Sequence, residues 1–272
     1  MKICPSYRVM QYNVLHQKEG WGPVELLVLG LETRKNNVER AIRTLQPDIL
    51  LLAERHDEWN GAGDSGVNLS ADLSPEYAFV QNSIFCEGIV AVNRVPIAYR
   101  TEVFRCVDSG FLKLMEEASF QNSNNKRVVT WAVLEDITDT DAKGQRIAVF
   151  CTHWSGGEHL QPFRQHQATQ TQNLIKQLLM NPEYRNLPIV VGGDFNADYH
   201  SAEYQSLLKG CELTDADVNF SRIDRIAVSG ACVVAFQAQI VPNASDHHPI
   251  YCDIKIETNG GHCYEAIFES HN

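Results

Sequence analysis

Residues 188–198, PIVVGGDFNAD, are the most informative segment of the chain about its architecture. The apolar run 189–193 is short and rich in valine, which is typical of a buried strand. Asp194 and Asn196 follow directly at its carboxyl end, where α/β sheets commonly meet their ligands. Taken alone, both residues are equally typical of a turn. Whether Asp194 and Asn196 are functional or turn residues therefore depends on the segments that precede and follow them.

Strand patterns recur on both sides of this segment. We predict a strand at 7–13, a helix from about 34 to 45 that ends before Pro47, and a buried strand at 49–54. Further strands are predicted at 77–81, 88–93, 97–104, 127–134, 146–153, 222–228, 232–240 and 249–256, with helices at 163–179 and 202–208. Many strands with few helices between them predict an α/β fold of two packed sheets with helices outside.

Polar side chains stand at the ends of these strands. They are Asn13 after VMQY, Glu54 after PDILLLA, His153 after IAVFCT, Asp194 and Asn196 after PIVVGG, Asp224 within SRIDRIAV, and Asp246 and His247 within SDHHPI. Strand ends at one edge of a sheet bring side chains that are distant in sequence into one cleft. We therefore expect these residues to line one site.

The oxygen-bearing members of this set suggest a hard cation. Asn13, Glu54, Asp194 and Asp246 offer amide and carboxylate oxygens, which suit Mg²⁺, Mn²⁺ or Ca²⁺ rather than Zn²⁺. Such a cation neutralises a phosphate group and stabilises the charge that develops in phosphoryl transfer. The ligand types leave Mg²⁺, Mn²⁺ and Ca²⁺ open; we expect Mg²⁺ as the cofactor, with Mn²⁺ as a possible substitute.

The two histidines of the set suggest phosphate contact and proton transfer. His153 and His247 can donate N–H groups to phosphate oxygens, and either can move a proton because histidine titrates near neutrality. A carboxylate beside His247 would fix its tautomer, and both Asp224 and Asp246 are candidates for that role.

Composition excludes several other classes of protein. Of 272 residues, 44% are apolar and 21% are charged, which argues against disorder, collagen and coiled coil. The 34 acidic and 23 basic residues give a net charge of −11, whereas proteins held on nucleic acid by electrostatics alone are normally basic. The sequence lacks a P-loop and a G-x-S-x-G elbow.

The eight cysteines and the amino-terminal segment bear on the compartment. No C-x-x-C pair is present, and Cys151, Cys232 and Cys252 lie in apolar contexts typical of reduced, buried thiols. Residues 1–14 show no signal-peptide pattern, and no apolar run is long enough to span a membrane. We expect a cytoplasmic protein, or an exported one whose leader has been removed; the sequence does not indicate an oligomeric state.

Six motifs together resemble a known family. They are QYNVL (11–15), PDILLLAE (47–54), THW (152–154), GGDFNAD (192–198), IDRIAVS (223–229) and SDHHPI (245–250). In this order they are similar to the motif set of the endonuclease/exonuclease/phosphatase superfamily, which has the DNase I-like fold. The resemblance implies a four-layer α/β sandwich, two mixed β-sheets flanked by helices, and in-line attack of water on a phosphoester with the help of a divalent metal.

The resemblance also implies a role for each residue of the set. Glu54 would be the principal metal ligand, with Asn13 in support and Asp246 near the metal. Asp194 would orient or deprotonate the attacking water, and Asn196 would hold water or phosphate beside it. His153 would donate to the phosphate, and His247 would stabilise the transition state or transfer a proton. Asp224 would orient His247.

Two departures from the family pattern bear on the substrate. Arg225 stands where the family commonly has an aromatic residue, and its side chain is expected to point away from the cleft. The stretch between Asp194 and Asp224 is short, and Asp215, Asp217 and Asn219 make it acidic, which argues against a grip on duplex DNA. We also expect Arg164 and Gln167 to hydrogen-bond the loop that follows His153.

The sequence predicts one catalytic domain over 1–257 and a loosely docked tail over 258–272. The favoured function is hydrolysis of a small or lipid-derived phosphoester, because the acidic balance suits a substrate with few phosphates. A nuclease acting on DNA or RNA is the alternative, with candidate contacts at Arg94, Arg100, Arg105, Lys113, Lys126 and Arg127. A non-catalytic binding module with the same fold is the third hypothesis.

Overall fold

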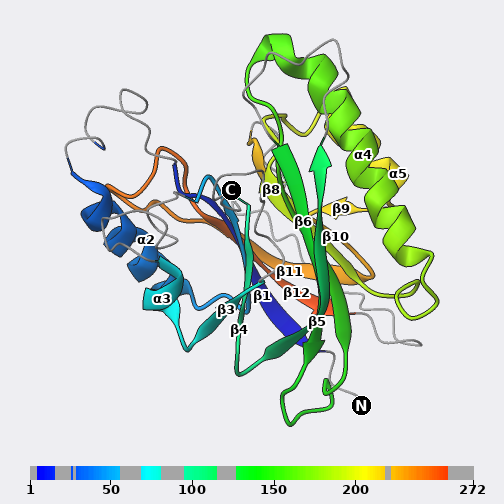
Figure 1. Ribbon diagram of the computed structural model, residues 1–272, viewed down its shortest axis with the longest axis horizontal. Coiled ribbons are helices and arrows are strands. Elements are labelled where there is room, and N and C mark those ends of the chain that lie inside the picture. Colours follow the sequence, from blue (N-terminus) through cyan, green and yellow to red (C-terminus); the bar gives the residue numbers. More distant parts are fainter. Residues whose placement is uncertain are drawn as a thin grey trace, which may run out of the picture.

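The computed structural model describes residues 5–15, 26, 29–55, 69–80, 95–114, 127–217 and 222–256. Two sheets face each other, with helices α2 and α3 on the outer side of one and α4 and α5 on the outer side of the other (Figure 1). This is the predicted four-layer α/β sandwich. The strand predicted at 88–93 and the tail predicted over 258–272 lie outside the described residues.

The first sheet contains both ends of the described chain. Its strands run in the order β11 (Ala231–Ala238), β12 (Ile250–Ile256), β1 (Ser6–Asn13), β2 (Ile49–Ala53), β4 (Ile97–Arg100) and β3 (Tyr77–Phe79). Only β1 and β2 pair in parallel within this sheet as described, and helix α2 (Leu31–Leu45) connects them. The short helix α3 (Leu69–Leu73) precedes β3.

The second sheet repeats this design. Its order is β5 (Phe104–Leu114), β6 (Arg127–Asp136), β7 (Arg146–His153), β8 (Ile189–Asp194), β10 (Asp224–Ser229) and β9 (Thr214–Asp215). Strands β7 and β8 pair in parallel, and the connection between them contains the 3₁₀ turn Glu158–Leu160 and helix α4 (Gln161–Leu179). Helix α5 (Ala202–Gly210) follows β8. Each sheet therefore has one central parallel pair whose carboxyl ends lie side by side.

The central strands are buried on both faces, which explains their continuous apolar runs. Between the sheets, Leu51 from β2 belongs to the same apolar cluster as Val149 and Ile226. On the outer faces, Leu50 packs in the α2 layer, and Phe150 packs in the α4 layer. Burial on both sides removes the polar alternation that would otherwise mark these segments as strands.

The strand predicted at 97–104 is confirmed only over its first half. Strand β4 ends at Arg100, a turn follows, and β5 runs from Phe104 to Leu114, so that most of it lies where the sequence predicted no strand. Strand β5 is an edge strand with polar residues and Gly110 in its middle, so it lacks an apolar run. Gly110 has a packing role, because a Cβ there would lie 2.9 Å from the indole of Trp131.

Two further expectations concern thiols and membranes. Cys151 and Cys252 are buried free thiols, as predicted, whereas Cys232 is only half-buried. In the described part of the chain, no helix is both long and apolar enough to cross a membrane.

Candidate active site

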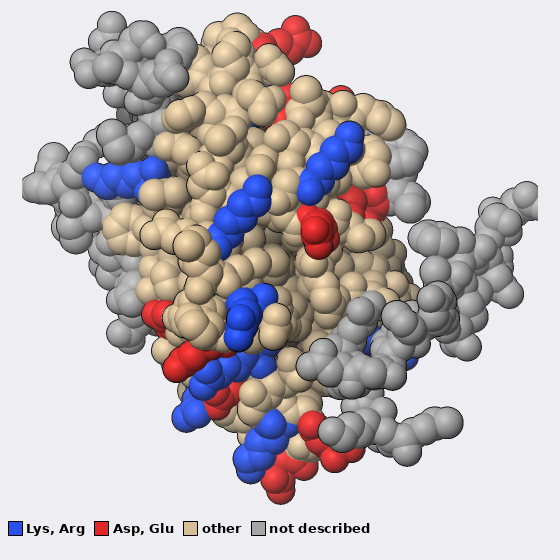
Figure 2. All heavy atoms as spheres, turned by 90° about the vertical axis from the view of Figure 1, so that its right-hand side faces the viewer, with Lys and Arg blue, Asp and Glu red and all other residues tan. Residues whose placement is uncertain are grey.

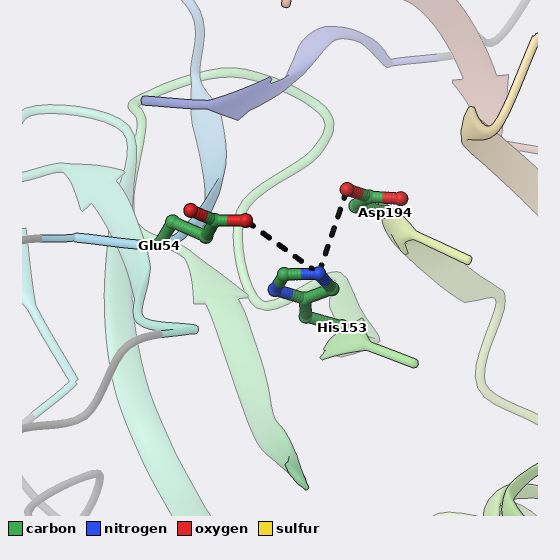
Figure 3. A group of neighbouring side chains, drawn as sticks. All are labelled: Glu54, His153 and Asp194. Atoms are coloured by element: carbon green, nitrogen blue, oxygen red, sulfur yellow. Dashed lines mark ion pairs between the residues drawn. The ribbon is translucent and has the colours of Figure 1, made fainter. Parts of the chain in front are cut away.

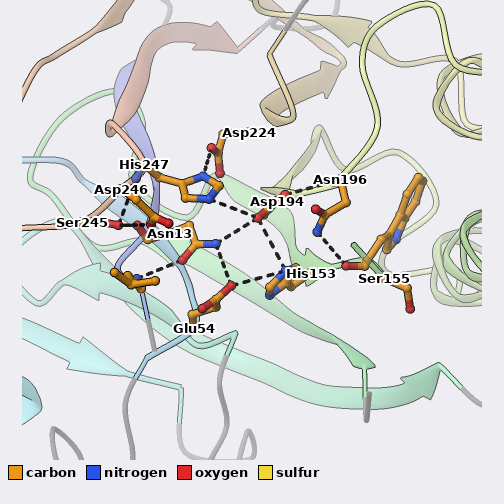
Figure 4. Close-up of polar contacts among 12 residues, drawn as sticks. Asn13, Glu54, His153, Ser155, Asp194, Asn196, Asp224, Ser245, Asp246 and His247 are labelled. Atoms are coloured by element: carbon orange, nitrogen blue, oxygen red, sulfur yellow. Dashed lines mark hydrogen bonds and ion pairs between the residues drawn. The ribbon is translucent and has the colours of Figure 1, made fainter. Parts of the chain in front are cut away.

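The site forms where the carboxyl ends of the two parallel pairs face each other (Figure 4). Asn13 ends β1, and Glu54 directly follows β2. His153 and Asp194 end β7 and β8, and they are register partners. Parallel pairing thus brings two candidate residues from each sheet together; the prediction from strand ends placed them at one edge of a single sheet, whereas two facing sheets contribute them.

Asp194 lies at the centre of this group. Asn13 Nδ2 donates hydrogen bonds to Asp194 Oδ2 at 2.9 Å and to Glu54 Oε1 at 3.1 Å. His153 Nε2 lies 3.5 Å from Asp194 Oδ2 and 3.8 Å from Glu54 Oε1 (Figure 3). His247 Nε2 lies 3.9 Å from the same Asp194 oxygen. Four residues from distant parts of the chain therefore surround one buried carboxylate.

Two glycines explain how β8 carries Asp194 into this position. A Cβ at Gly192 would lie 2.4 Å from Leu51 Cδ1 of the opposite sheet, and a Cβ at Gly193 would lie 1.9 Å from the Thr152 carbonyl oxygen. Side chains at these positions would push β8 away from both neighbours. The GG pair of the sequence thus lets the two sheets approach where the site forms.

Two residues of the site have an unusual backbone conformation. Glu54 and Asn196 have φ angles of 58° and 48°, in the left-handed region that non-glycine residues rarely adopt. Such conformations cost of order 1–3 kcal/mol each and occur where the surrounding structure imposes them, often at functional sites. At Glu54 the left-handed turn ends β2. The sequence does not reveal the strain at Glu54, because glutamate is not a residue that favours a left-handed turn, whereas asparagine tolerates one at position 196.

Asp224 and His247 form the second part of the site. The Asp224 Oδ2 and His247 Nδ1 atoms are 2.5 Å apart, which is the contact that the predicted orienting role of Asp224 requires. Burial, the largest single influence, lowers the pKa of His247. The hydrogen bond that the ring donates to Asp224 and the charges of Asp224 and Asp194 outweigh it and raise this pKa to about 9. The ring is therefore cationic at neutral pH, with Nε2–H directed towards Asp194.

Burial also changes the protonation of Asp194. Its exposed fraction is 2%. Burial, followed by the charge of Asp224, raises the pKa of Asp194 to about 7, although His247 and Asn13 act in the opposite direction. Among the described residues, no lysine or arginine pairs with this carboxylate. It is a carboxylate that positive charge would strongly stabilise.

The loop after His153 positions Asn196. Trp154 N–H donates to the Asp194 carbonyl, and Asn196 Nδ2 donates to the Trp154 carbonyl at 2.9 Å. Gln167 on α4 accepts from Ser155 N–H and donates to Ser155 Oγ, both at 2.9 Å. These bonds confirm the prediction that Gln167 holds the loop.

Arg164 binds the same loop from the next turn of the helix. Its Nη1 donates to the carbonyl oxygens of Ser155 and Gly157 at 3.2 and 2.8 Å, also as predicted. Its Nε donates to Glu203 of α5 at 2.8 Å. Glu203 is 1% exposed, so this is a buried ion pair that joins both outer helices to the loop.

The sequence did not indicate a second buried arginine, which binds the loops of the first sheet at this site. Arg34 of α2 is fully buried and donates to the carbonyl oxygens of Val14, Leu15 and Ala244. It thereby joins the loop after Asn13 to the loop before His247. No sequence signal marks it, because an arginine in an amphipathic helix resembles a solvated residue.

The described residues contain two overlapping groups of close metal-ligating atoms. One is Glu54, His153 and Asp194, and the other is Asp194, Asp224 and His247. The carboxylates of the first group fit a divalent cation, because the buried Asp194 needs positive charge and Glu54 brings a second carboxylate near it.

The two remaining predicted ligands are placed differently. Asp246 is exposed, contacts Ser245 Oγ at 3.4 Å and belongs to neither group. Asn13 turns its amide nitrogen to the carboxylates, and its Oδ1 accepts from Leu15 N–H. The ligand roles of Asp246 and Asn13 therefore stay predictions.

The acidic stretch before Asp224 is largely neutralised by arginines. Fully buried Arg225 donates from Nε to Asp215 at 2.6 Å and lies over the rings of Tyr199 and Tyr204. Arg222 Nε lies 2.9 Å from Asp217 Oδ2. Arg225 thus serves the packing beside β9, as expected of a side chain that points away from the cleft. Because Asp215 and Asp217 pair with arginines, these two carboxylates do not make the surface beside β9 acidic, as the sequence had suggested.

Solved structures share this fold at low sequence identity. An endonuclease/exonuclease/phosphatase family protein from Bacteroides thetaiotaomicron is 19% identical, with a TM-score of 0.72 over 97% of this chain and all of that one. A mannosyl-6-phosphatase from the same organism is 18% identical, with a TM-score of 0.68 over 91% and 99% of the two chains. ANGEL2, a 2',3'-cyclic phosphatase solved with adenosine-2',3'-vanadate, is 15% identical, with a TM-score of 0.75 over 93% and 96%.

A comparison with curated proteins found no match. The model of the Endonuclease/Exonuclease/phosphatase family matches residues 10–247, which include every predicted site residue. The match covers most of the chain and agrees with the two-sheet architecture. This chain belongs to the Endonuclease/Exonuclease/phosphatase family.

Proposed function

We propose that this protein is a Mg²⁺-dependent phosphoester hydrolase in which water attacks phosphorus in line. One observation carries the proposal: the buried Asp194 carboxylate lies within 4 Å of ring nitrogens of both His153 and His247. A proton acceptor and two N–H donors therefore surround one space, which is the set that water activation and phosphate binding require.

Each residue has a role in this proposal. Asp194 orients the attacking water and accepts its proton. Cationic His247, held by Asp224, donates from Nε2 to a phosphate oxygen and opposes the negative charge that develops there. His153 donates to a second phosphate oxygen, and Asn196 holds water or phosphate beside Asp194.

Glu54 and Asp194 would hold the metal, with Asn13 and Asp246 as further candidates. A bound divalent ion neutralises phosphate charge and lowers the pKa of nearby water. Mn²⁺, which accepts the same oxygen ligands, is the expected substitute.

The substrate class that we favour is a small or lipid-derived phosphoester. Net charge is −11, and two of the basic residues considered for nucleic-acid contact pair with carboxylates of the same chain. Arg105 binds Glu135, and Arg100 pairs with Asp48 and Glu102. On the face that includes α4 and α5, basic side chains of the described residues are separated by uncharged surface or lie beside acidic ones (Figure 2). Similar folds include a mannosyl-6-phosphatase and a 2',3'-cyclic phosphatase.

A panel of phosphoesters assayed with Mg²⁺ tests the proposal. It contains sugar phosphates, cyclic nucleotides, phosphoinositides, sphingomyelin, and single- and double-stranded nucleic acids. We expect hydrolysis of a small or lipid substrate, loss of activity in excess EDTA, and recovery with Mg²⁺. Asp194→Asn should abolish turnover, while Asp139→Asn is the matched control, because the Asp139 side chain is 99% exposed and pairs with Lys143 in a surface turn.

Three outcomes would contradict the proposal. Activity in excess chelator would exclude the metal mechanism. Preferred hydrolysis of nucleic acid, with affinity that falls steeply as salt rises, would support the nuclease alternative. An intact fold that hydrolyses none of the panel with Mg²⁺ or Mn²⁺ would support the binding module.

A further inference from the structure

Gln11 lies on a central strand of the first sheet, and its side chain reaches a residue of the second sheet. Its strand β1 is flanked by β12 and β2, and its side chain is fully buried between the sheets. Its Nε2 donates to Asp224 Oδ1 at 3.0 Å. The other Asp224 oxygen faces His247 Nδ1. Gln11 is therefore linked to His247 through a single carboxylate.

The register of the strands makes this contact specific. Gln11 and Asn13 are two residues apart on β1, so their side chains point to the same face. Asp224 and Asp194 are direct partners on antiparallel strands β10 and β8. The two amides of β1 therefore face the two paired carboxylates, and each donates to one of them, at 3.0 and 2.9 Å. The Q-x-N spacing of the sequence matches the width of the Asp194–Asp224 pair.

Stability alone does not explain an amide at position 11. Its register partners Leu51 and Ile250 belong to the apolar cluster between the sheets. Gln11 Oε1 is buried and has no hydrogen-bond partner among the described residues. A buried acceptor without a hydrogen-bond partner destabilises the folded state. An apolar residue would avoid that cost, so the donation to Asp224 is the contact that accounts for a glutamine here.

We propose that Gln11 is a positioning residue of the active site, which holds the Asp224 carboxylate so that His247 presents Nε2–H towards the phosphate. This inference rests on the proposed function. Without the bond from Gln11, the Asp224 carboxylate is free to rotate about its terminal torsion, and the His247 ring loses its fixed orientation. Gln11 itself touches neither substrate nor reacting atoms; it acts through Asp224.

Gln11→Met tests the role, because methionine keeps the length of the side chain and removes its donor. We expect kcat to fall about 10- to 100-fold, the usual effect of losing such a supporting hydrogen bond. KM for a small phosphoester should change less than about threefold, because Gln11 touches no substrate. Gln172→Met is the matched control, since the half-buried Gln172 donates to Ser206 Oγ between α4 and α5; it should keep the wild-type kcat.

A double variant separates positioning from a general loss of structure. In the Asp224→Asn background, Gln11→Met should reduce kcat no further, because both changes break the same link. Multiplicative losses would overturn the inference, as would a wild-type kcat in Gln11→Met when Asp224→Asn is impaired. If the Gln11→Met protein does not fold, Gln11→Leu serves as the second variant.

The ring of His247 provides a readout that does not depend on activity. In the metal-free wild type, ¹⁵N-resolved NMR should show a strongly hydrogen-bonded Nδ1 proton. That signal should weaken in Gln11→Met and stay unchanged in Gln172→Met. An unchanged signal in Gln11→Met would overturn the inference even if no phosphoester were hydrolysed, so its failure is distinguishable from failure of the proposed function.

Discussion

Asp194 and Asp224 lie directly opposite each other on antiparallel strands β8 and β10. Two carboxylates at paired positions repel each other, and the charge of Asp224 contributes to the raised pKa of Asp194. The amides of Asn13 and Gln11 and the ring of His247 offset this repulsion in part. The arrangement concentrates negative charge where the proposed cation would bind, so stability and function oppose each other at this pair.

The first prediction is that Asp194→Asn stabilises the metal-free protein above neutral pH. The pKa of Asp194 is about 7 in the folded protein, against about 3.9 in an unfolded chain. A raised pKa contributes stability that is complete below the unfolded value and is lost as pH rises through the folded value. Wild-type stability should therefore fall between about pH 4 and 7 through this group, and the variant should lack that loss.

Urea unfolding in excess EDTA at about pH 5 and pH 8 measures this difference. We expect the variant to be more stable than the wild type by about 1 kcal/mol or more at the higher pH. Mg²⁺ should then stabilise the wild type more than the variant. If the free energy of unfolding depended on pH equally in both proteins, the raised pKa of Asp194 would be contradicted.

The second prediction concerns the alkaline limit of activity. His247 has a pKa raised to about 9, so its cationic form, the proposed phosphate donor, is lost as pH rises through that value. Asp224→Asn removes the hydrogen bond and the charge that raise this pKa. We expect the alkaline limb of the kcat profile to move about one unit or more towards neutral pH, with kcat reduced about 10- to 100-fold.

Rate profiles from about pH 6 to 10 check the shift. Asp139→Asn should leave the limb in place, because Asp139 lies on an exposed turn. A limb that stays unchanged in Asp224→Asn would show that His247 does not act as the cationic donor.

The third prediction is that Gly156→Ala impairs catalysis without unfolding the protein. A Cβ at Gly156 would lie 2.9 Å from Asn196 Oδ1, so the added methyl group should displace that side chain. The backbone of Gly156 is outside the left-handed region, so alanine introduces no strain in φ. We expect kcat to fall about tenfold with a Tm close to that of the wild type.

Steady-state kinetics in the Asn196→Ala background provides the control. Gly156→Ala should have no further effect on kcat there, because the displaced amide is already absent. If Gly156→Ala still lowered kcat about tenfold in that background, the cause would be a change in the loop rather than displacement of Asn196.

The fourth prediction concerns the buried pair of Arg164 and Glu203. Arg164→Met leaves Glu203 buried without its counter-charge and releases the carbonyl oxygens of Ser155 and Gly157. We expect the free energy of unfolding to fall by about 3–5 kcal/mol. The double variant Arg164→Met/Glu203→Met should be more stable than Arg164→Met alone. Urea unfolding measures both free energies. A double variant that is less stable than Arg164→Met alone would contradict the role of Glu203 as a buried charge.

The sequence by itself identified the central strands and the candidate site. The apolar runs that end in Asn13, Glu54, His153 and Asp194 carry their own signal, because strands buried on both faces need continuous apolar residues. The family motifs gave these ends their order and their expected roles. Strand β5 escaped prediction, because an edge strand with one solvated face needs no such run.

Only the tertiary structure decided how the site is held together. The bond from Gln11 to Asp224, the binding of loop carbonyls by Arg34 and Arg164, and the pairing of Arg225 with Asp215 join segments far apart in the chain. A short stretch of sequence indicates secondary-structure propensity and hydrophobic periodicity, both of which involve only a few neighbouring residues. Hydrogen bonds and charge pairs depend on which residues two separate strands or helices bring within about 3 Å, and packing alone determines that.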